Sequence, residues 1–162
     1  MRKPTAAELA DPERSFNRLL FAAQDMGECR AAIEFLPTRK EISGDVRRAL
    51  ETGAVVAYAR PWGKSNTIGA LEDHWLPQEP KQRALHHELI KDRNKLYAHT
   101  DEEIKARWVQ GADWESGATR KPASILPAWR PLTLDRLPEI AQLAESQKDR
   151  FIAGVSELIR QS

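Results

Sequence analysis

The chain has 162 residues, of which 41% are hydrophobic and 30% charged, an ordinary globular composition that does not indicate disorder. Lysine and arginine number 25 against 24 acidic residues, so the net charge excludes a broad, strongly basic surface for nucleic acid or membrane. We expect one domain over residues 1–162, on which any polyanion site is a local patch.

The sequence carries no sign of secretion, of a membrane span or of a metal or cofactor site. Cys29 is the single cysteine, so no internal disulfide can form, and a lone thiol suits a reducing compartment. Apolar runs of membrane-spanning length, an N-terminal signal segment, Cys/His ligand clusters and glycine-rich phosphate loops are all missing from the sequence. We therefore expect a cytoplasmic protein with no membrane, metal or cofactor association.

The first helix is predicted to begin at Pro12. Asp11 is suited to cap it, and proline is favoured at the first helical position. The helical spacing continues to Pro37, and either one long helix or two helices broken near Gly27 would fit it. Its apolar positions are Phe16, Leu19, Leu20, Ala23, Met26, Ala31, Ala32, Ile33, Phe35 and Leu36.

A second helix is predicted to begin at the Ser-Gly-Asp sequence of residues 43–45, which can cap it. Val55 and Val56 would also suit a strand, but the helical spacing before them favours a helix. It should end at Arg60, because a residue before proline disfavours the helical conformation. A loop over residues 61–66 and a short helical turn around Ile68 to Trp75 are expected next. The apolar contacts should come from Val46, Leu50, Val55, Val56, Ala57 and Tyr58.

A central helix is predicted from Pro80 or Lys81 to the vicinity of Ala98. His86 and His87 are neighbours on it and should point apart, so we expect one packed and one solvent-facing histidine rather than a metal site. Its apolar stripe consists of Leu85, Leu89, Ile90, Leu96 and Tyr97.

The last helix is predicted to begin between Thr133 and Pro138. Before it, residues 104–131 hold glycines, prolines and three tryptophans, and we expect an irregular excursion or a short hairpin there. Amphipathic helices must bury their apolar sides together, so the expected fold is all-α, an up-and-down bundle of four to five helices. The apolar side of the last helix consists of Leu137, Ile140, Ala144, Phe151, Val155, Leu158 and Ile159.

The central helix leads into Arg93 and Asn94, followed by His99. This order resembles the Arg-polar-His signature of the HEPN superfamily, α-helical domains found in many toxin and phage-defence ribonucleases. Arg60 before Pro61 at a helix end is similar to the abortive-infection-type branch of that superfamily. The signature covers only a few residues, but the helical character of nearly the whole chain agrees with the family fold.

The resemblance implies metal-independent RNA cleavage, in which a ribose 2′-hydroxyl attacks the adjacent phosphate and leaves a 2′,3′-cyclic phosphate. In that scheme His99 acts as general base or acid, because its ordinary pKa suits proton transfer near neutrality. Arg93 holds the phosphate oxygens through its planar guanidinium, and Asn94 orients Arg93 or the phosphate. Arg60 and Lys95 are expected as further phosphate or RNA contacts; the alternative for Arg60 is an ordinary surface arginine, and for Lys95 a solvated lysine is the default.

Helical geometry sets a condition on this scheme. On an ideal helix Arg93 and His99 would lie roughly 120° apart, so they converge only if the helix ends or distorts between them or if the site is composite. The family usually pairs two such motifs across a homodimer, which would also supply a second proton-transfer group. The resemblance therefore implies a homodimer, RNA as substrate and, in a toxin pair, a cognate antitoxin.

Two other interpretations remain open from the sequence. Arg93 could pair with Glu88, Asp92 or Asp101 while Asn94 caps the helix end and His99 interacts with the helix dipole, which would make the motif structural. Alternatively, the chain is a catalytically inactive HEPN-like dimer that binds RNA, a nucleotide or a protein partner.

Overall fold

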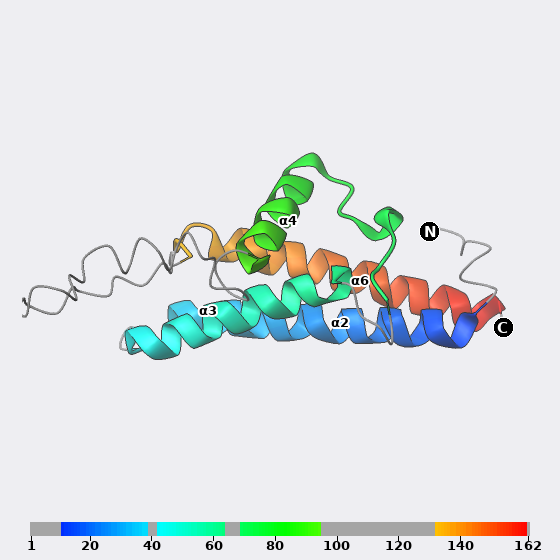
Figure 1. Ribbon diagram of the computed structural model, residues 1–162, viewed down its shortest axis with the longest axis horizontal. Coiled ribbons are helices and arrows are strands. Elements are labelled where there is room, and N and C mark those ends of the chain that lie inside the picture. The colour runs from blue at the N-terminus through cyan, green and yellow to red at the C-terminus, as the bar shows by residue number, and fades with distance from the viewer. Residues whose placement is uncertain (1–10, 39–41, 64–68, 95–131, 162) are drawn as a thin grey trace, which may run out of the picture.

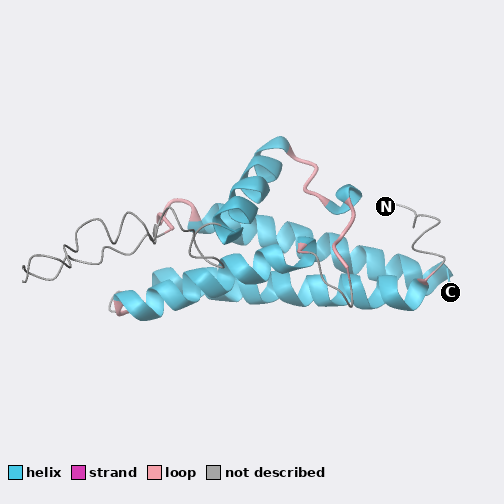
Figure 2. Ribbon diagram, viewed as in Figure 1, coloured by secondary structure: helices cyan, strands magenta, loops and turns pink. Residues whose placement is uncertain are grey.

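The computed structural model describes residues 11–38, 42–63, 69–94 and 132–161, and these ranges consist of helices joined by loops and turns without any strand (Figures 1 and 2). Four long helices account for most of them, which confirms the all-α bundle predicted from the sequence. The predicted excursion over residues 104–131 lies outside the described residues. No helix in the described part of the chain is both long and apolar enough to cross a membrane.

Helices α2 (Pro12–Phe35) and α6 (Leu137–Gln161) form the long antiparallel pair on which the fold is built (Figure 1). The α2 helix begins as predicted, with the side chain of Asp11 accepting a hydrogen bond from the Arg14 backbone N–H (3.1 Å). It runs through Gly27 as a single helix, and a 3₁₀ turn, η1 (Leu36–Thr38), follows it. Near the opposite end of the pair, Arg30 and Glu145 are joined by an ion pair of 2.6 Å.

Helix α3 (Gly44–Ala59) packs on α2 and begins where the sequence predicts, with Ser43 Oγ accepting the Val46 N–H (3.3 Å). It ends at Ala59, and a 3₁₀ turn, η2 (Arg60–Trp62), stands where the sequence analysis expected a loop. Proline is compatible with this turn because its missing N–H falls at the first positions, where no partner is needed.

The segment between α3 and α4 is attached to α6. Its short helical turn is the 3₁₀ helix η3 (Asp73–Trp75), a little shorter than predicted. Arg150 of α6 donates hydrogen bonds to the backbone carbonyls of His74 (3.1 Å), Trp75 (3.2 Å) and Leu76 (2.8 Å). One partly buried guanidinium, bonded to three carbonyls, therefore fixes the chain just before α4.

Helix α4 (Pro80–Asp92) is inclined to the other three helices and packs on α3 and α6 (Figure 1). Its predicted start at Pro80 is confirmed, and the carboxylate of Glu79 caps it by accepting the N–H groups of Lys81 (3.2 Å) and Gln82 (2.9 Å). Regular α-helical geometry ends at Asp92, earlier than the predicted vicinity of Ala98, and residues 93–94 form a wider π-type turn.

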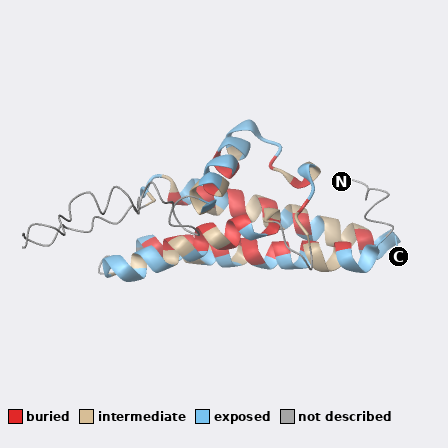
Figure 3. Ribbon diagram, in the orientation of Figure 1, coloured by how far each residue is buried: buried red, intermediate tan, exposed pale blue. Residues whose placement is uncertain are grey.

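The core lies along the facing sides of α2, α3 and α6, with α4 adding Leu85 and Leu89 (Figure 3). The sequence prediction of buried residues was wrong at the edges of the apolar stripes, because Leu20, Phe35, Val46 and Ile159 are between 43% and 62% exposed. Conversely, Leu143 and Gln147 of α6 are fully buried although the prediction did not include them. Cys29 is a buried core residue, and burial raises the pKa of its thiol to about 12.

Candidate functional site

The candidate site is the C-terminal end of α4, where two of the three predicted catalytic residues are described. Arg93 is half-buried and Asn94 is exposed. Nη1 of Arg93 donates a hydrogen bond to Oδ1 of Asn94 at 3.0 Å, so the predicted arginine–amide pair is present as a contact. The wider turn at these residues replaces the regular helix, and such turns inside or after α-helices are frequent at functional sites.

One acidic candidate for pairing with Arg93, Glu88, is engaged elsewhere. Both carboxylate oxygens of Glu88 accept hydrogen bonds from Arg136, at 2.6 and 2.8 Å. This bidentate pair joins α4 to the turn that leads into α6, and hydrogen bonding from Arg136 lowers the pKa of the Glu88 carboxyl. Among the residues that the structure describes, no carboxylate forms an ion pair with Arg93.

The electrostatics of this helix end bear on what it can bind. The last carbonyl groups of α4 carry partial negative charge, which stabilises a nearby guanidinium and disfavours a bare anion. A phosphate could therefore bind here only through the positive charge and hydrogen-bond donors of Arg93, with Asn94 limiting how the guanidinium turns.

Behind the motif, α4 is fixed by a buried histidine. The hydroxyl of Tyr58 on α3 lies 3.0 Å from Nδ1 of His86, and the Trp62 ring packs edge-on against the imidazole at a centroid distance of 4.6 Å. Burial, then the charges of His87 and Arg83, lower the pKa of His86 to about 4, while burial raises that of Tyr58. At neutral pH the imidazole is therefore uncharged, and its tautomer decides whether Nδ1 accepts from the Tyr58 hydroxyl or donates to it.

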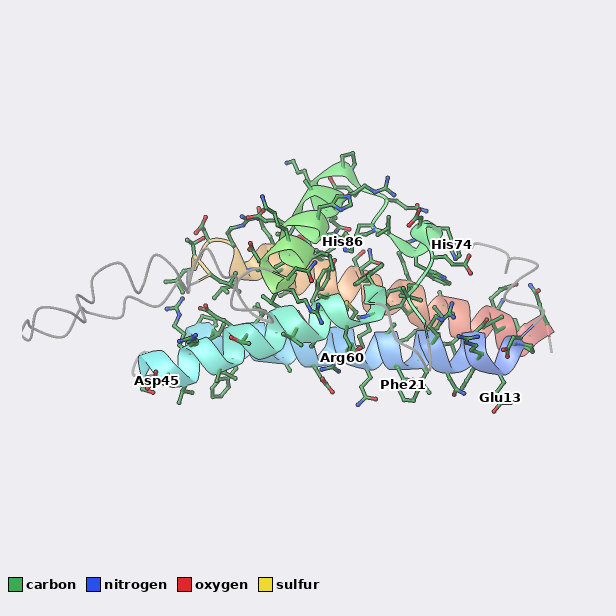
Figure 4. All side chains as sticks on the ribbon, viewed as in Figure 1. Glu13, Phe21, Asp45, Arg60, His74 and His86 are labelled. Atoms are coloured by element: carbon green, nitrogen blue, oxygen red, sulfur yellow. The ribbon has the colours of Figure 1, made fainter. Side chains whose placement is uncertain are left out.

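His86 is packed and His87 is exposed, as predicted (Figure 4 labels His86). Their rings do not point apart, however, but lie edge to face at a centroid distance of 5.2 Å. A buried imidazole with so low a pKa is a poor proton donor near neutrality, so His86 is not a candidate acid catalyst. In the described ranges no three His, Cys, Asp or Glu side chains come together as a potential metal site.

Arg60, a predicted phosphate contact, is exposed, but its guanidinium is turned toward α2 (Figure 4). Its guanidinium forms an ion pair with the buried carboxylate of Asp25 and lies 3.6 Å from Oε2 of Glu28. Burial raises the pKa of Asp25 to about 6, although the positive charge of Arg60 acts against that rise. A phosphate at Arg60 would have to compete with two carboxylates.

His99 and Lys95 lie outside the described residues, so the structure brings together Arg93 and Asn94 only. Sequence reasoning did not identify the residues that hold the motif helix in place, namely Tyr58, Trp62 and Arg136. Tyr58 appeared only as an apolar contact, and Arg136 precedes α6 in a stretch with no distinctive pattern. His86 was accessible to sequence reasoning, because it shares the apolar side of the helix with Leu89.

The chain was also compared with known proteins. Scans of the chain against protein-family models, and searches of curated proteins and of solved structures, find no match.

Proposed function

We propose that the chain is a metal-independent endoribonuclease of the HEPN type, acting in the cytoplasm as a toxin or phage-defence component. Arg93 binds the non-bridging phosphate oxygens, and His99 transfers the proton between the 2′-hydroxyl and the leaving oxygen. Asn94 holds the guanidinium in its binding orientation. The products are a 2′,3′-cyclic phosphate and a free 5′-hydroxyl.

The observation that carries this proposal is the contact between Arg93 and Asn94 at the exposed end of α4. Glu88, one of the three acids that a purely structural Arg93 could use, instead binds Arg136 in a bidentate pair. The turn that interrupts the helix at these residues also relaxes the geometric condition, because residues after it need not continue the helical rotation.

A single motif supplies one arginine and one histidine, whereas acid–base cleavage benefits from two proton-transfer groups. We propose that a homodimer with two facing motifs forms the complete site, that RNA is the substrate and that an antitoxin restrains the activity. Lys95 and Arg60 are secondary RNA contacts in this proposal, Arg60 only where RNA displaces its carboxylate partners.

Cleavage of single-stranded RNA by the purified protein in EDTA tests the proposal. We expect activity to persist in EDTA and to fall by about 100-fold or more in Arg93→Ala and in His99→Ala, as for loss of a catalytic electrostatic or acid–base group. Lys91→Ala is the matched control, since Lys91 is an exposed cation two residues earlier on the same helix and should retain activity.

Three outcomes would count against this function. Loss of cleavage on chelation would indicate metal-dependent chemistry, and equal activity of the two variants and the wild type would remove the motif from the reaction. RNA binding that weakens in Arg93→Ala, without any cleavage by the wild type, would instead favour the catalytically inactive HEPN-like dimer.

A further inference from the structure

The ion pair between Arg60 and Asp25 joins an exposed cation to a buried carboxylate. The side chain of Arg60 is 56% exposed, whereas that of Asp25 is 10% exposed. Glu28, whose Oε2 lies 3.6 Å from Nη1 of Arg60, has a side chain that is 50% exposed. An anion in solution can therefore reach the guanidinium, while the carboxylate that the guanidinium neutralises is largely shielded from water.

The positions of the two partners follow from their places on the helices. Asp25 occupies a buried position of α2, between the core residues Ala22 and Cys29. Arg60 ends α3, and its backbone N–H donates to the carbonyls of Ala57 and Val56. Because that backbone is fixed by the helix end, the guanidinium can turn from α2 toward a ligand by side-chain rotation alone. The short side chain of Asp25 cannot follow it.

An anion that draws Arg60 away from Asp25 changes the charge balance of the buried carboxylate. A carboxylate left in the interior without its cation is strongly destabilising, because it stays charged where it is poorly solvated. A phosphate nearby adds a second negative charge, which also disfavours the ionised form. A proton on the carboxyl removes both penalties, since a neutral acid is far less costly to bury. Binding of a phosphate at Arg60 is therefore linked to uptake of one proton from solvent at Asp25.

The pKa of Asp25 already lies in the range that this linkage requires. Burial raises it to about 6, the positive charge of Arg60 acts against that rise, and the negative charge of Glu28 adds to it. In the described part of the chain these two residues are the charged groups that act on Asp25, and none comes from α4 or α6. A phosphate that draws Arg60 away removes the charge that lowers the pKa of Asp25, so this pKa rises further on binding.

We propose that Arg60 is a proton-gated contact for the phosphates of single-stranded RNA, which binds a phosphate when Asp25 has taken up a proton and otherwise stays paired with Asp25. RNA as the ligand rests on the proposed function. Arg60 lies two residues after Tyr58, which contacts His86, so it stands where α3 packs on the motif helix α4. The coupling to the proton comes from the burial of Asp25 and is independent of the cleavage reaction.

Fluorescence anisotropy of the full chain with a labelled, single-stranded 2′-O-methyl RNA, from about pH 8 to about pH 5, tests this proposal. The methyl groups remove the attacking hydroxyl, so cleavage does not interfere. Asp25→Asn should bind at least about tenfold more tightly than the wild type at about pH 8, because its neutral side chain leaves Arg60 available. The difference should shrink by at most about tenfold per pH unit, as for one proton, and vanish below about pH 6. Titrations common to the two chains cancel in this comparison.

Glu28→Gln is the matched control, because it removes the other carboxylate near the same guanidinium. Water can solvate the exposed Glu28 when Arg60 leaves, so no proton is needed there and this variant should keep the wild-type pH dependence. Arg60→Ala should bind as the wild type does at about pH 8 and about tenfold more weakly at about pH 5. Circular dichroism checks its folding, and if it does not fold, the comparison of Asp25→Asn with the wild type decides the question.

Three results would overturn the proposal. They are parallel pH curves for the wild type and Asp25→Asn, a folded Arg60→Ala that binds as tightly as the wild type at about pH 5, and a wild type that binds no RNA over the whole range. Cleavage of ordinary RNA together with parallel pH curves would retain the proposed function and reject the coupling alone. Coupled binding by a chain that cleaves no RNA would do the reverse.

Discussion

At the scale of single residues, the buried hydrogen bond between Tyr58 and His86 is the interaction near the candidate site whose loss we expect to lower the free energy of unfolding most. Tyr58→Phe keeps the ring but leaves the buried Nδ1 of His86 without its hydrogen-bond partner, a change that costs about 1–3 kcal/mol. We expect thermal unfolding to shift down by several degrees. In a double-mutant cycle, His86→Leu combined with Tyr58→Phe should cost less than the two single losses together, and strictly additive losses would contradict the contact.

Asp25 and His86 should make opposite contributions to the pH dependence of stability. The pKa of Asp25 rises from 3.8 to about 6 on folding, so the unfolded chain loses that proton first and this contribution to stability falls as pH rises toward about 6. The pKa of His86 falls from 6.5 to about 4, so its contribution is lost as pH falls through the same range. The two effects partly cancel in the wild type.

Asp25→Asn should expose this cancellation. The variant removes the carboxyl that favours the folded state in acid, so its melting temperature should fall more steeply than that of the wild type as pH is lowered from about 6.5 to about 4. Melting curves of both proteins across that range measure the difference, in which titrations common to the two chains cancel. An unchanged slope would mean that Asp25 is not protonated by burial.

At the scale of helices, the sequence predicted where each helix begins better than which of its side chains are buried. The caps at Asp11 and Ser43 and the proline start at Pro80 depend on local chemistry and were confirmed. Burial depends on which neighbour covers each edge of a helix, and periodicity alone does not contain that information. Leu20 and Ile159 therefore satisfied the helical spacing but proved exposed on the side of α2 and α6 that no described element covers.

The next prediction concerns Gly154 of α6, which packs closely against Trp75 of η3. A Cβ at Gly154 would lie 2.4 Å from Cη2 of Trp75, a rigid ring atom, so Gly154→Ala should destabilise the fold by about 1–3 kcal/mol despite the better helix propensity of alanine. Gly53→Ala on α3 is the matched control. It has nothing within 4 Å of the new atom and should stabilise by about 0.5–1 kcal/mol. Chemical denaturation measures both, and equal effects would reject close packing at Gly154.

At the scale of the whole molecule, the sequence predicted the bundle but only part of the candidate site. Arg93 and Asn94 were identified from local order and do form a contact. The long-range pairs that hold their helix, Tyr58 with His86 and Glu88 with Arg136, join residues 28 and 48 positions apart. A local sequence pattern does not predict such pairs, because each residue could pair with many other residues of the chain.

The packing of the described residues predicts that α4 is the least stable of their four long helices. α2 and α6 contact each other along their lengths, whereas α4 contacts α3 and α6 over short stretches and relies on the Tyr58–His86 and Glu88–Arg136 pairs. In hydrogen exchange, we expect the amides of α4 to exchange at least about tenfold faster than those of central α2 and α6. Glu88→Gln, which removes the charge of the second pair, should accelerate exchange in α4 alone, while Glu13→Gln, an exposed control on α2, should not. Uniform protection of all four helices, or acceleration spread over α2 and α6, would show that the motif helix belongs to the same cooperative unit as the core.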